Sequence, residues 1–243
     1  MIGLKHWFVK WSTARSFVVG TATGSAPSAE SASRRKAGRP RGELLNRSKI
    51  AGAALRFVGD RGYDALTMSA LAKALGVSAS ALYNHVESKQ EVLQLVQDRV
   101  MDDVDCSGFA SQPLGEAVRR WAGSYRDVFA RHAPLVPVIA VLPVSGSPRT
   151  LQMYEQVAAG FARAGWDQQR IVPAIVALES FIFGSALDAV APKDIFNVDH
   201  AVDDVPAFAG AVASQRATGD DPAQDAFEYG LDALVRGLLA GAA

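Results

Sequence analysis

The residue types best suited to chemistry lie in a short segment that begins at Ser78. Its first four residues are small, which would let the backbone approach the edges of DNA bases: Ser78, Ala79, Ser80 and Ala81. Hydroxyl, imidazole and ammonium groups follow on Tyr83, His85 and Lys89, where they are placed to contact phosphates. Alone, Tyr83 is more often a packing residue and His85 a capping or surface histidine. Their combined spacing favours a segment that binds duplex DNA.

Catalysis and metal binding find less support in the sequence. The four histidines, at positions 6, 85, 132 and 200, show no ligand spacing with Cys106 or with paired acids. Gly184-Ser185 lacks the pattern of a nucleophile elbow. We therefore expect no enzyme, no metal and no cofactor.

Two short helices joined by a turn would position the DNA-binding segment. Apolar residues recur on one face of the first helix: Met68, Leu71, Ala72 and Leu75. Thr67 is its candidate N-cap and Gly76 ends it. Ser78 can cap the second helix, which has Leu82 and Val86 inward. This is a helix-turn-helix pattern, in which the second helix enters the major groove.

A helix on each side completes the small domain. The first carries Ile50, Phe57 and Val58 on one stripe and stops at Gly62. The last opens at Ser88-Lys89-Gln90-Glu91, a capping box in which the Ser and Glu side chains reciprocally accept hydrogen bonds from free backbone N–H groups.

Helical periodicity continues beyond this domain, and no stretch alternates convincingly as a strand, so the predicted fold class is all-α. Further helices are expected at about 113–131, 134–141, 148–164, 168–190, 205–217 and 222–240. Ser147-Pro148 and Asp221-Pro222 each place a cap residue before a proline at the first helical position, and Asp167 precedes another helix.

The segment 168–190 is apolar on two faces. One stripe holds Ile171, Ile175, Leu178, Ile182 and Ala186, and the other holds Val172, Val176, Phe183, Leu187 and Val190. One face can cover the chain's own core while the other meets a second copy, with Gly184, Ser185 and Ala186 allowing close approach. Burial of both faces within one chain is the alternative.

Charge divides the chain, although the formal net charge is zero. Residues 1–41 carry eight basic residues and one acidic residue, and residues 101–243 carry ten and eighteen. A basic front favours a polyanionic partner for that part alone. Residues 1–41 are interpreted as a flexible, disordered basic extension. The sequence contains no run of eighteen apolar residues, so we do not expect a membrane protein. The single cysteine agrees with a reducing cytoplasm.

Residues 67–89, TMSALAKALGVSASALYNHVESK, resemble the TetR family of repressors. The continuation from L-A-x-x-L-G-V-S through L-Y-x-H-V to a Ser-Lys pair is characteristic of that family. The resemblance implies a three-helix DNA-binding domain at 42–104, with its helix-turn-helix motif at about 67–86. A larger helical domain for effector binding and dimerisation would occupy 105–243.

The resemblance implies roles for individual residues in DNA binding. Phosphate contacts fall to Thr67, Tyr83, His85 and Lys89, and base readout to Ser78, Ala79, Ser80 and Asn84. Ser69 departs from the pattern, because some relatives have a longer basic residue there. The second helix offers no Arg, Lys or Gln before Lys89, so bidentate guanine readout is not available from it. Specificity is then expected from Asn84, from thymine contacts with the alanines, from DNA shape, or from Arg39 and Arg41 entering a minor groove.

In TetR-like proteins two helices of each subunit form a four-helix dimer interface, here 168–190 and 222–240, with Phe183, Gly184, Ser185 and Ala186 at the contact. The central helix also lines a ligand cavity, which places the predicted effector site at Trp121, Tyr125, Phe129, Leu178 and Ile182. These five residues are ordinary core on the simpler interpretation. The expected protein is a homodimeric, cytoplasmic repressor released from double-stranded operator DNA by a small, largely apolar effector. An effector-independent DNA-binding protein and a ligand-dependent activator are the alternatives.

Overall fold

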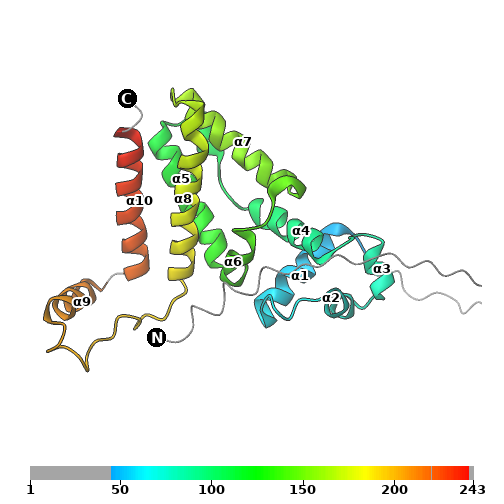
Figure 1. Ribbon diagram of the computed structural model, residues 1–243, viewed down its shortest axis with the longest axis horizontal. Helices are drawn as coiled ribbons and strands as arrows, with labels where there is room; N and C mark the ends of the chain where they lie inside the picture. Colours follow the sequence, from blue (N-terminus) through cyan, green and yellow to red (C-terminus); the bar gives the residue numbers. More distant parts are fainter. Residues whose placement is uncertain (1–44, 220, 241–243) are drawn as a thin grey trace, which may run out of the picture. The chain divides into compact units, whose positions relative to one another are not determined.

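The computed structural model describes residues 45–219 and 221–240, and that part of the chain is built from helices and turns without a strand (Figure 1). The all-α fold class is therefore confirmed. The predicted extension 1–41, with Arg39 and Arg41, lies outside the described residues.

Four helices form the small domain: α1 (Arg47–Arg61), α2 (Met68–Leu75), α3 (Ala79–Tyr83) and α4 (Lys89–Met101). Each begins after a polar residue whose side chain accepts a hydrogen bond from the backbone N–H three residues on. These N-caps are Asn46, Thr67, Ser78 and Ser88. The caps supply acceptors for N–H groups that have no partner inside the helix. The first residue of each helix in this domain is thus set by a capping residue within the same short segment.

The turn between α2 and α3 depends on one glycine. Gly76 has φ 68° and ψ 27°, the left-handed conformation that side chains with a Cβ rarely adopt. The N–H of Val77 then donates to the Ala72 carbonyl at 3.0 Å, which closes the end of α2. With the turn fixed, α3 packs Leu82 into the core, and Val86 follows it. The outer side of α3 is left at the surface.

The second half of the chain is a helical bundle. Its long helices are α5 (Leu114–Ala130), α7 (Pro148–Arg163), α8 (Gln168–Asp188) and α10 (Pro222–Ala240), with α9 (Pro206–Thr218) between the last two. Short pieces connect them: η1 (Ser107–Ala110), η2 (Ala133–Leu135), α6 (Val136–Ile139) and η3 (Val144–Gly146). The helix predicted at 134–141 is shorter than expected because two prolines, Pro134 and Pro137, break it into a 3₁₀ turn and one helical turn.

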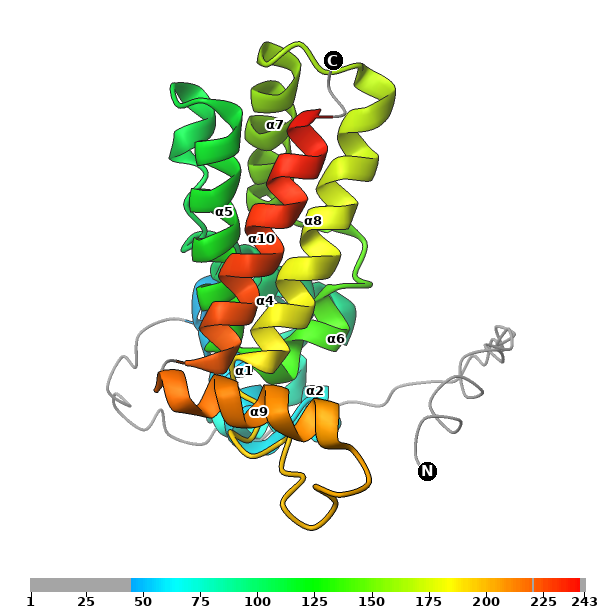
Figure 2. The same ribbon diagram turned by 90° about the vertical axis from the view of Figure 1, so that its left-hand side faces the viewer.

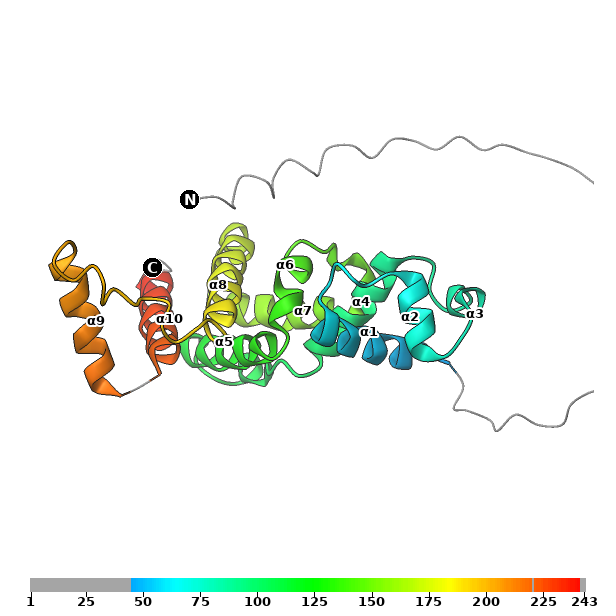
Figure 3. The same cartoon turned by 90° about the horizontal axis from the view of Figure 1, so that it is seen from below.

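Within the bundle α5 packs against α8 and α10, and α8 and α10 lie side by side (Figure 2). Phe181 of α8 stacks on Phe227 of α10 with ring centroids 5.6 Å apart. Gly230 permits this approach, since a Cβ there would lie 2.6 Å from the Phe181 ring. In contrast, α9 buries only Ala209 and Val212 and lies beyond α10 in the view from below (Figure 3).

Helix α8 is long and apolar enough, by length and composition alone, to cross a membrane, with a mean hydropathy of 1.7 in its most apolar window. Its inner stripe is nevertheless packed, because Leu178, Ile182 and Ala186 are fully buried against the chain's own helices. Core helices have the same composition, so this is weak evidence for a membrane span.

Candidate nucleic-acid interface and effector core

The outer side of α3 presents the residues predicted to contact bases. Ser78, Ala79, Ser80 and Asn84 are exposed, and Tyr83 is 50% exposed. Leu82, on the inner side, has no exposed surface. The division follows from the helical period, because the residues that anchor α3 lie opposite the residues that face solvent. The structure therefore places the predicted base-contacting residues on one accessible surface.

The serine hydroxyls of this surface are unequally engaged. The Ser78 Oγ accepts a hydrogen bond from the Ala81 N–H at 3.1 Å and lies 3.0 Å from the Ser80 Oγ. Ser78 is therefore first a helix cap, and its capacity for base contact is reduced. Ser80 carries no capping duty, so its hydroxyl is the better placed of the two for DNA.

The residues predicted to contact phosphates differ in their exposure and in their hydrogen bonds. Thr67 is exposed, but its Oγ1 accepts the Ala70 N–H at 3.1 Å as the cap of α2. The Lys89 ammonium lies 3.9 Å from the Tyr63 ring centroid, and its Nζ donates to the Tyr63 carbonyl at 3.5 Å. A phosphate must compete with this ring for Lys89. His85 is half-buried, and Ser69 is exposed on the first turn of α2.

The capping box of α4 differs from the predicted form by one residue. The Ser88 Oγ accepts the Glu91 N–H at 3.1 Å as expected, but the Glu91 carboxylate accepts the N–H of Glu87 at 2.6 Å rather than that of Ser88. Arg47 of α1 also pairs with Glu91. The Glu87 hydrogen bond, followed by Arg47, lowers the pKa of Glu91 against the opposing effect of burial. The sequence did not predict this ion pair, because Arg47 and Glu91 are 44 residues apart.

An open polar cleft of about 350 Å³ lies beside this ion pair. Its walls come from the starts of α1 and α4 and from Gly146 in the η3 turn. Its openness to solvent gives a small ligand little burial, so the cleft is a weaker candidate than the bundle interior.

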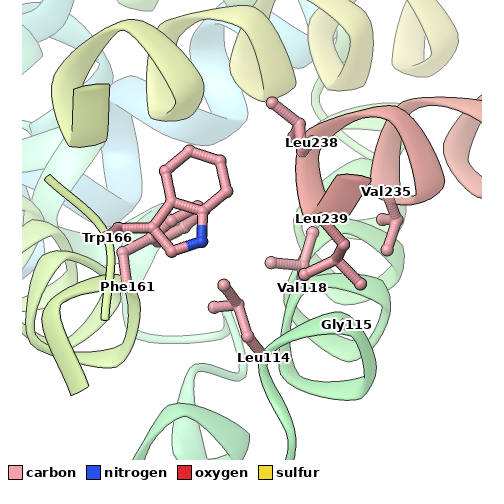
Figure 4. Close-up of a pocket in the computed structure, with 8 residues that line it drawn as sticks. All are labelled: Leu114, Gly115, Val118, Phe161, Trp166, Val235, Leu238 and Leu239. Atoms are coloured by element: carbon pink, nitrogen blue, oxygen red, sulfur yellow. The ribbon is translucent and has the colours of Figure 1, made fainter. Parts of the chain in front are cut away.

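The predicted effector residues do meet between α5 and α8. Trp121, Tyr125, Phe129, Leu178 and Ile182 are each no more than 1% exposed. The Tyr125 ring centroid lies 5.6 Å from that of Trp121 and 5.0 Å from that of Phe129. These residues are closely packed. The nearby cavity, which Val118, Trp166 and Leu238 help to line, measures only about 10 Å³, room for roughly one water (Figure 4).

A buried polar group that the sequence reasoning missed lies in the same core. The Glu179 Oε1 accepts hydrogen bonds from the hydroxyls of Tyr125 at 3.1 Å and Tyr154 at 2.8 Å, and Oε2 lies 3.0 Å from the latter. Burial raises the pKa of Glu179 despite these bonds. Burial, followed by the nearby Glu179 charge, also raises the pKa values of both tyrosines. An acid three residues before Ile182, within an apolar stripe, was the available signal.

The expected two faces of α8 are present. The outer stripe leaves Val172, Val176 and Leu187 65%, 52% and 43% exposed. Gly184 is exposed and Ser185 half-buried.

Two residues predicted at the subunit contact turn inward instead. Ala186 has no exposed surface, so the prediction that it meets a partner is wrong for this arrangement. Phe183 packs its ring 5.5 Å from Tyr125 and 5.2 Å from Phe129. The period of the helix explains both, since Ala186 lies four residues after the buried Ile182 and Phe183 lies three residues before Ala186.

A polar junction links the small domain to the bundle. Ser147 does not cap α7 as predicted; its hydroxyl donates to Gln97 at 3.1 Å. Asp98 of α4 instead accepts the Arg149 N–H at 3.0 Å in the first turn of α7. Burial raises the pKa of Asp98, partly offset by this bond. The other two predicted caps are confirmed, with Asp167 and Asp221 accepting N–H groups two residues on.

Two family profiles match the chain. Residues 50–96 match the profile described as bacterial regulatory proteins, tetR family, and residues 111–241 match the tetracyclin repressor-like C-terminal domain. The chain belongs to the TetR family. Among curated relatives, an uncharacterized HTH-type transcriptional regulator of Mycobacterium tuberculosis is 35% identical over 106 residues, 42% of this chain and 48% of that protein. The tetracycline repressor protein class E of Escherichia coli is 23% identical over 81% of this chain and 92% of its own length.

The chain spans 48%, 60% and 53% of the lengths of three curated relatives that it matches. Solved TetR-family structures are matched more completely. ActR of Streptomyces coelicolor, in complex with (S)-DNPA, superposes with a TM-score of 0.68 at 25% identity, covering 82% of this chain and 98% of ActR. BioQ of Mycobacterium smegmatis superposes with a TM-score of 0.61 at 26% identity, covering 81% and 99%.

Proposed function

We propose that this TetR-family protein is a homodimeric transcriptional repressor that leaves its operator when a small, largely apolar effector binds. The observation that carries the DNA-binding part is the surface of α3. A helix anchored by Leu82 presents Ser80 and Asn84 outward, with Tyr83 beside them, and small side chains keep its backbone open to base edges. BioQ, whose fold this chain shares, has been solved with its double-stranded DNA operator.

The dimer is proposed to form through the outer faces of α8 and α10. Val176 and Leu187 on α8 and Tyr229 on α10 are large side chains left in solvent, Tyr229 at 80% exposure. Gly184 and Gly237 on the same helices let backbones approach closely. Pairing two copies there would remove this apolar surface from water and set the distance between two α3 helices.

The effector is proposed to bind between α5 and α8, in the core around Tyr125 and Phe129. Because these residues are closely packed, an effector must separate the helices to enter. The displacement can reach the small domain through the α4–α7 junction, where Gln97 and Asp98 bond to Ser147 and Arg149. A ligand that binds the separated form better shifts the protein away from the DNA-binding form. ActR, a structural relative, has been solved in complex with (S)-DNPA and with actinorhodin.

Selection from a random duplex library would identify the operator sequence. The selected duplex is then titrated by fluorescence anisotropy at several salt concentrations. We expect wild-type affinity to fall steeply with salt, because phosphate contacts release counterions. Replacing Tyr83 with Phe and both His85 and Lys89 with Ala should weaken binding, whereas Lys193→Ala, which removes a distant exposed charge, should not. Failure to enrich any sequence, or unchanged affinity in the triple variant, would remove α3 from this role.

An effector-independent DNA-binding protein is the second candidate, and the closely packed core favours it. The two functions differ in one measurement. A ligand screen by thermal shift, followed by operator release, should yield compounds that stabilise the wild type and lower its operator affinity. Compounds that stabilise the protein and leave DNA binding unchanged would favour the second candidate.

A further inference from the structure

Glu179 is a buried acid in the middle of α8 with no countercharge among the described residues. It is 9% exposed, and both of its hydrogen-bond donors are neutral phenols, Tyr125 and Tyr154. No arginine or lysine contributes to holding its charge. An isolated buried carboxylate is costly unless a cation pairs with it. Two neutral donors leave the ionised form of Glu179 without a countercharge in the described part of the chain.

Tyr125 connects the acid to a cluster of aromatic rings. The Tyr125 ring, whose hydroxyl bonds to Glu179, contacts the rings of Phe129 and Phe183 with centroids 5.0 Å and 5.5 Å away. Phe129 and Phe183 also contact each other at 5.2 Å. The faces of such rings carry partial negative charge and attract cations. A carboxylate hydrogen-bonded to one ring of a three-ring cluster is a chemical environment suited to an organic cation.

A buried polar group on α5 lacks a hydrogen-bond partner within the part of the chain that the structure describes. The Trp121 Nε1 is completely buried and has no hydrogen-bond acceptor among the described residues. Trp121 lies one turn before Tyr125, and their ring centroids are 5.6 Å apart. An unpaired indole N–H in a core is unusual, because leaving it without an acceptor costs free energy. Within residues 45–219 and 221–240, the same core therefore has a carboxyl group whose ionised form lacks a countercharge and an indole N–H that lacks an acceptor.

We propose that the effector is an aromatic molecule with a positively charged amine. The charge pairs with Glu179, the ring lies among Tyr125, Phe129 and Phe183, and Trp121 donates its N–H to an acceptor atom of the same ligand. This inference rests on the proposed effector-controlled function and names the ligand class for the same site. Tyr154, which is half-buried at the edge of the core, is the group that a ligand must displace to reach Glu179.

The test uses two probes that differ only in charge, benzyltrimethylammonium and its uncharged carbon analogue neopentylbenzene. Calorimetry on the full chain without DNA should give at least about tenfold tighter binding of the cation. Glu179→Gln, which keeps the size and an acceptor oxygen, should abolish this preference. Glu155→Gln, which removes an exposed carboxylate one residue from Tyr154, should retain it. Equal affinity for the probes, no binding of either, or a preference that survives in Glu179→Gln overturns the proposal.

A measurement on the wild type guards against misfolding of the variant. The ionisable groups that face Glu179 are Tyr125 of α5 and Tyr154 of α7. Both have pKa values raised well above neutrality, so Glu179 alone titrates at the site in mildly acidic solution. Affinity for the cation should rise with pH from about 4.5, Glu179's ordinary value, while affinity for neopentylbenzene stays constant. A cation affinity independent of pH contradicts the proposal.

Operator release, measured separately, distinguishes this inference from the proposed function. A Glu179-dependent preference for the cation with no effect on DNA affinity supports the ligand class and removes effector control. Release of the operator by neutral apolar compounds, without any preference for charge, preserves effector control and removes the ligand class.

Discussion

The surface of α3 and the core between α5 and α8 use polar groups in opposite ways. On α3, hydroxyl and amide groups face water, and their internal partners lie within three residues, as in the Ser78 cap on Ala81. In the core, Glu179 is shielded from water and its partners Tyr125 and Tyr154 are 54 and 25 residues away. A polar group at the surface costs little free energy in the absence of DNA, because water hydrogen-bonds to it. A buried polar group costs free energy unless it has a hydrogen-bond partner within the protein. The comparison predicts that substitutions in the two regions will separate stability from binding.

The largest expected effect comes from a matched pair of aromatic truncations. Phe129→Ala should reduce the free energy of unfolding by about 3–5 kcal/mol, since it opens a cavity in the core. Tyr83→Ala, at a half-exposed site, should reduce it by less than about 1 kcal/mol and yet weaken operator binding. Urea denaturation and anisotropy measure the two quantities. Equal losses of stability would mean that α3 depends on Tyr83 for packing, and would contradict a separation of binding from stability between the two regions.

A charge introduced on the outer face of α8 should have the next largest effect. Val176→Glu is expected to weaken dimerisation by roughly 3 kcal/mol, because an unpaired carboxylate would be buried at the interface. Sedimentation velocity would show monomers at concentrations where the wild type is dimeric. Val141→Glu is the control, since Val141 is the same residue type, is 69% exposed and lies outside α8 in the sequence. If both variants remain dimers, the interface lies elsewhere.

Asn84→Ala should have a smaller and more specific effect. We expect a loss of about 1–3 kcal/mol at one base position of each half-site, with other positions unchanged. Binding to a set of single-base operator variants measures this loss. Gln152→Ala removes an exposed amide from α7 and should leave every position unchanged. A uniform loss across all sequences would reassign Asn84 from base readout to phosphate contact.

The smallest effect concerns the pH dependence of stability. Burial raises the pKa of Glu179 above 4.5, so the folded chain holds this proton more tightly than the unfolded chain. This contribution is complete below about 4.5 and is lost as pH rises through the folded value. The stability of the wild type relative to Glu179→Gln should therefore fall with increasing pH above 4.5, by at most about 1.4 kcal/mol per unit. If the relative stability instead rises over this range, the folded protein stabilises the ionised carboxylate of Glu179.

Local sequence patterns predicted the long helices, the helix-turn-helix and the exposed residues of α3. These features depend on interactions between neighbours in the chain, such as the Thr67 cap, the left-handed Gly76 and the helical period that turns Leu82 inward. The same period separated the two faces of α8. The family resemblance added the expectation that aromatic residues of α5 would meet α8, and they do.

Contacts between residues far apart in the sequence could be seen only in the tertiary structure. Lys89 stacks on Tyr63, and Asp98 accepts the N–H that Ser147 was expected to cap. Glu179 stood in the sequence as an interruption of an apolar run, and only the packing of α5, α7 and α8 made it a buried acid between two tyrosines. Local patterns fix a residue's side of a helix, but its partner and its burial depend on the segment that packs against that side. That segment lies tens of residues away and leaves no signal at the residue itself.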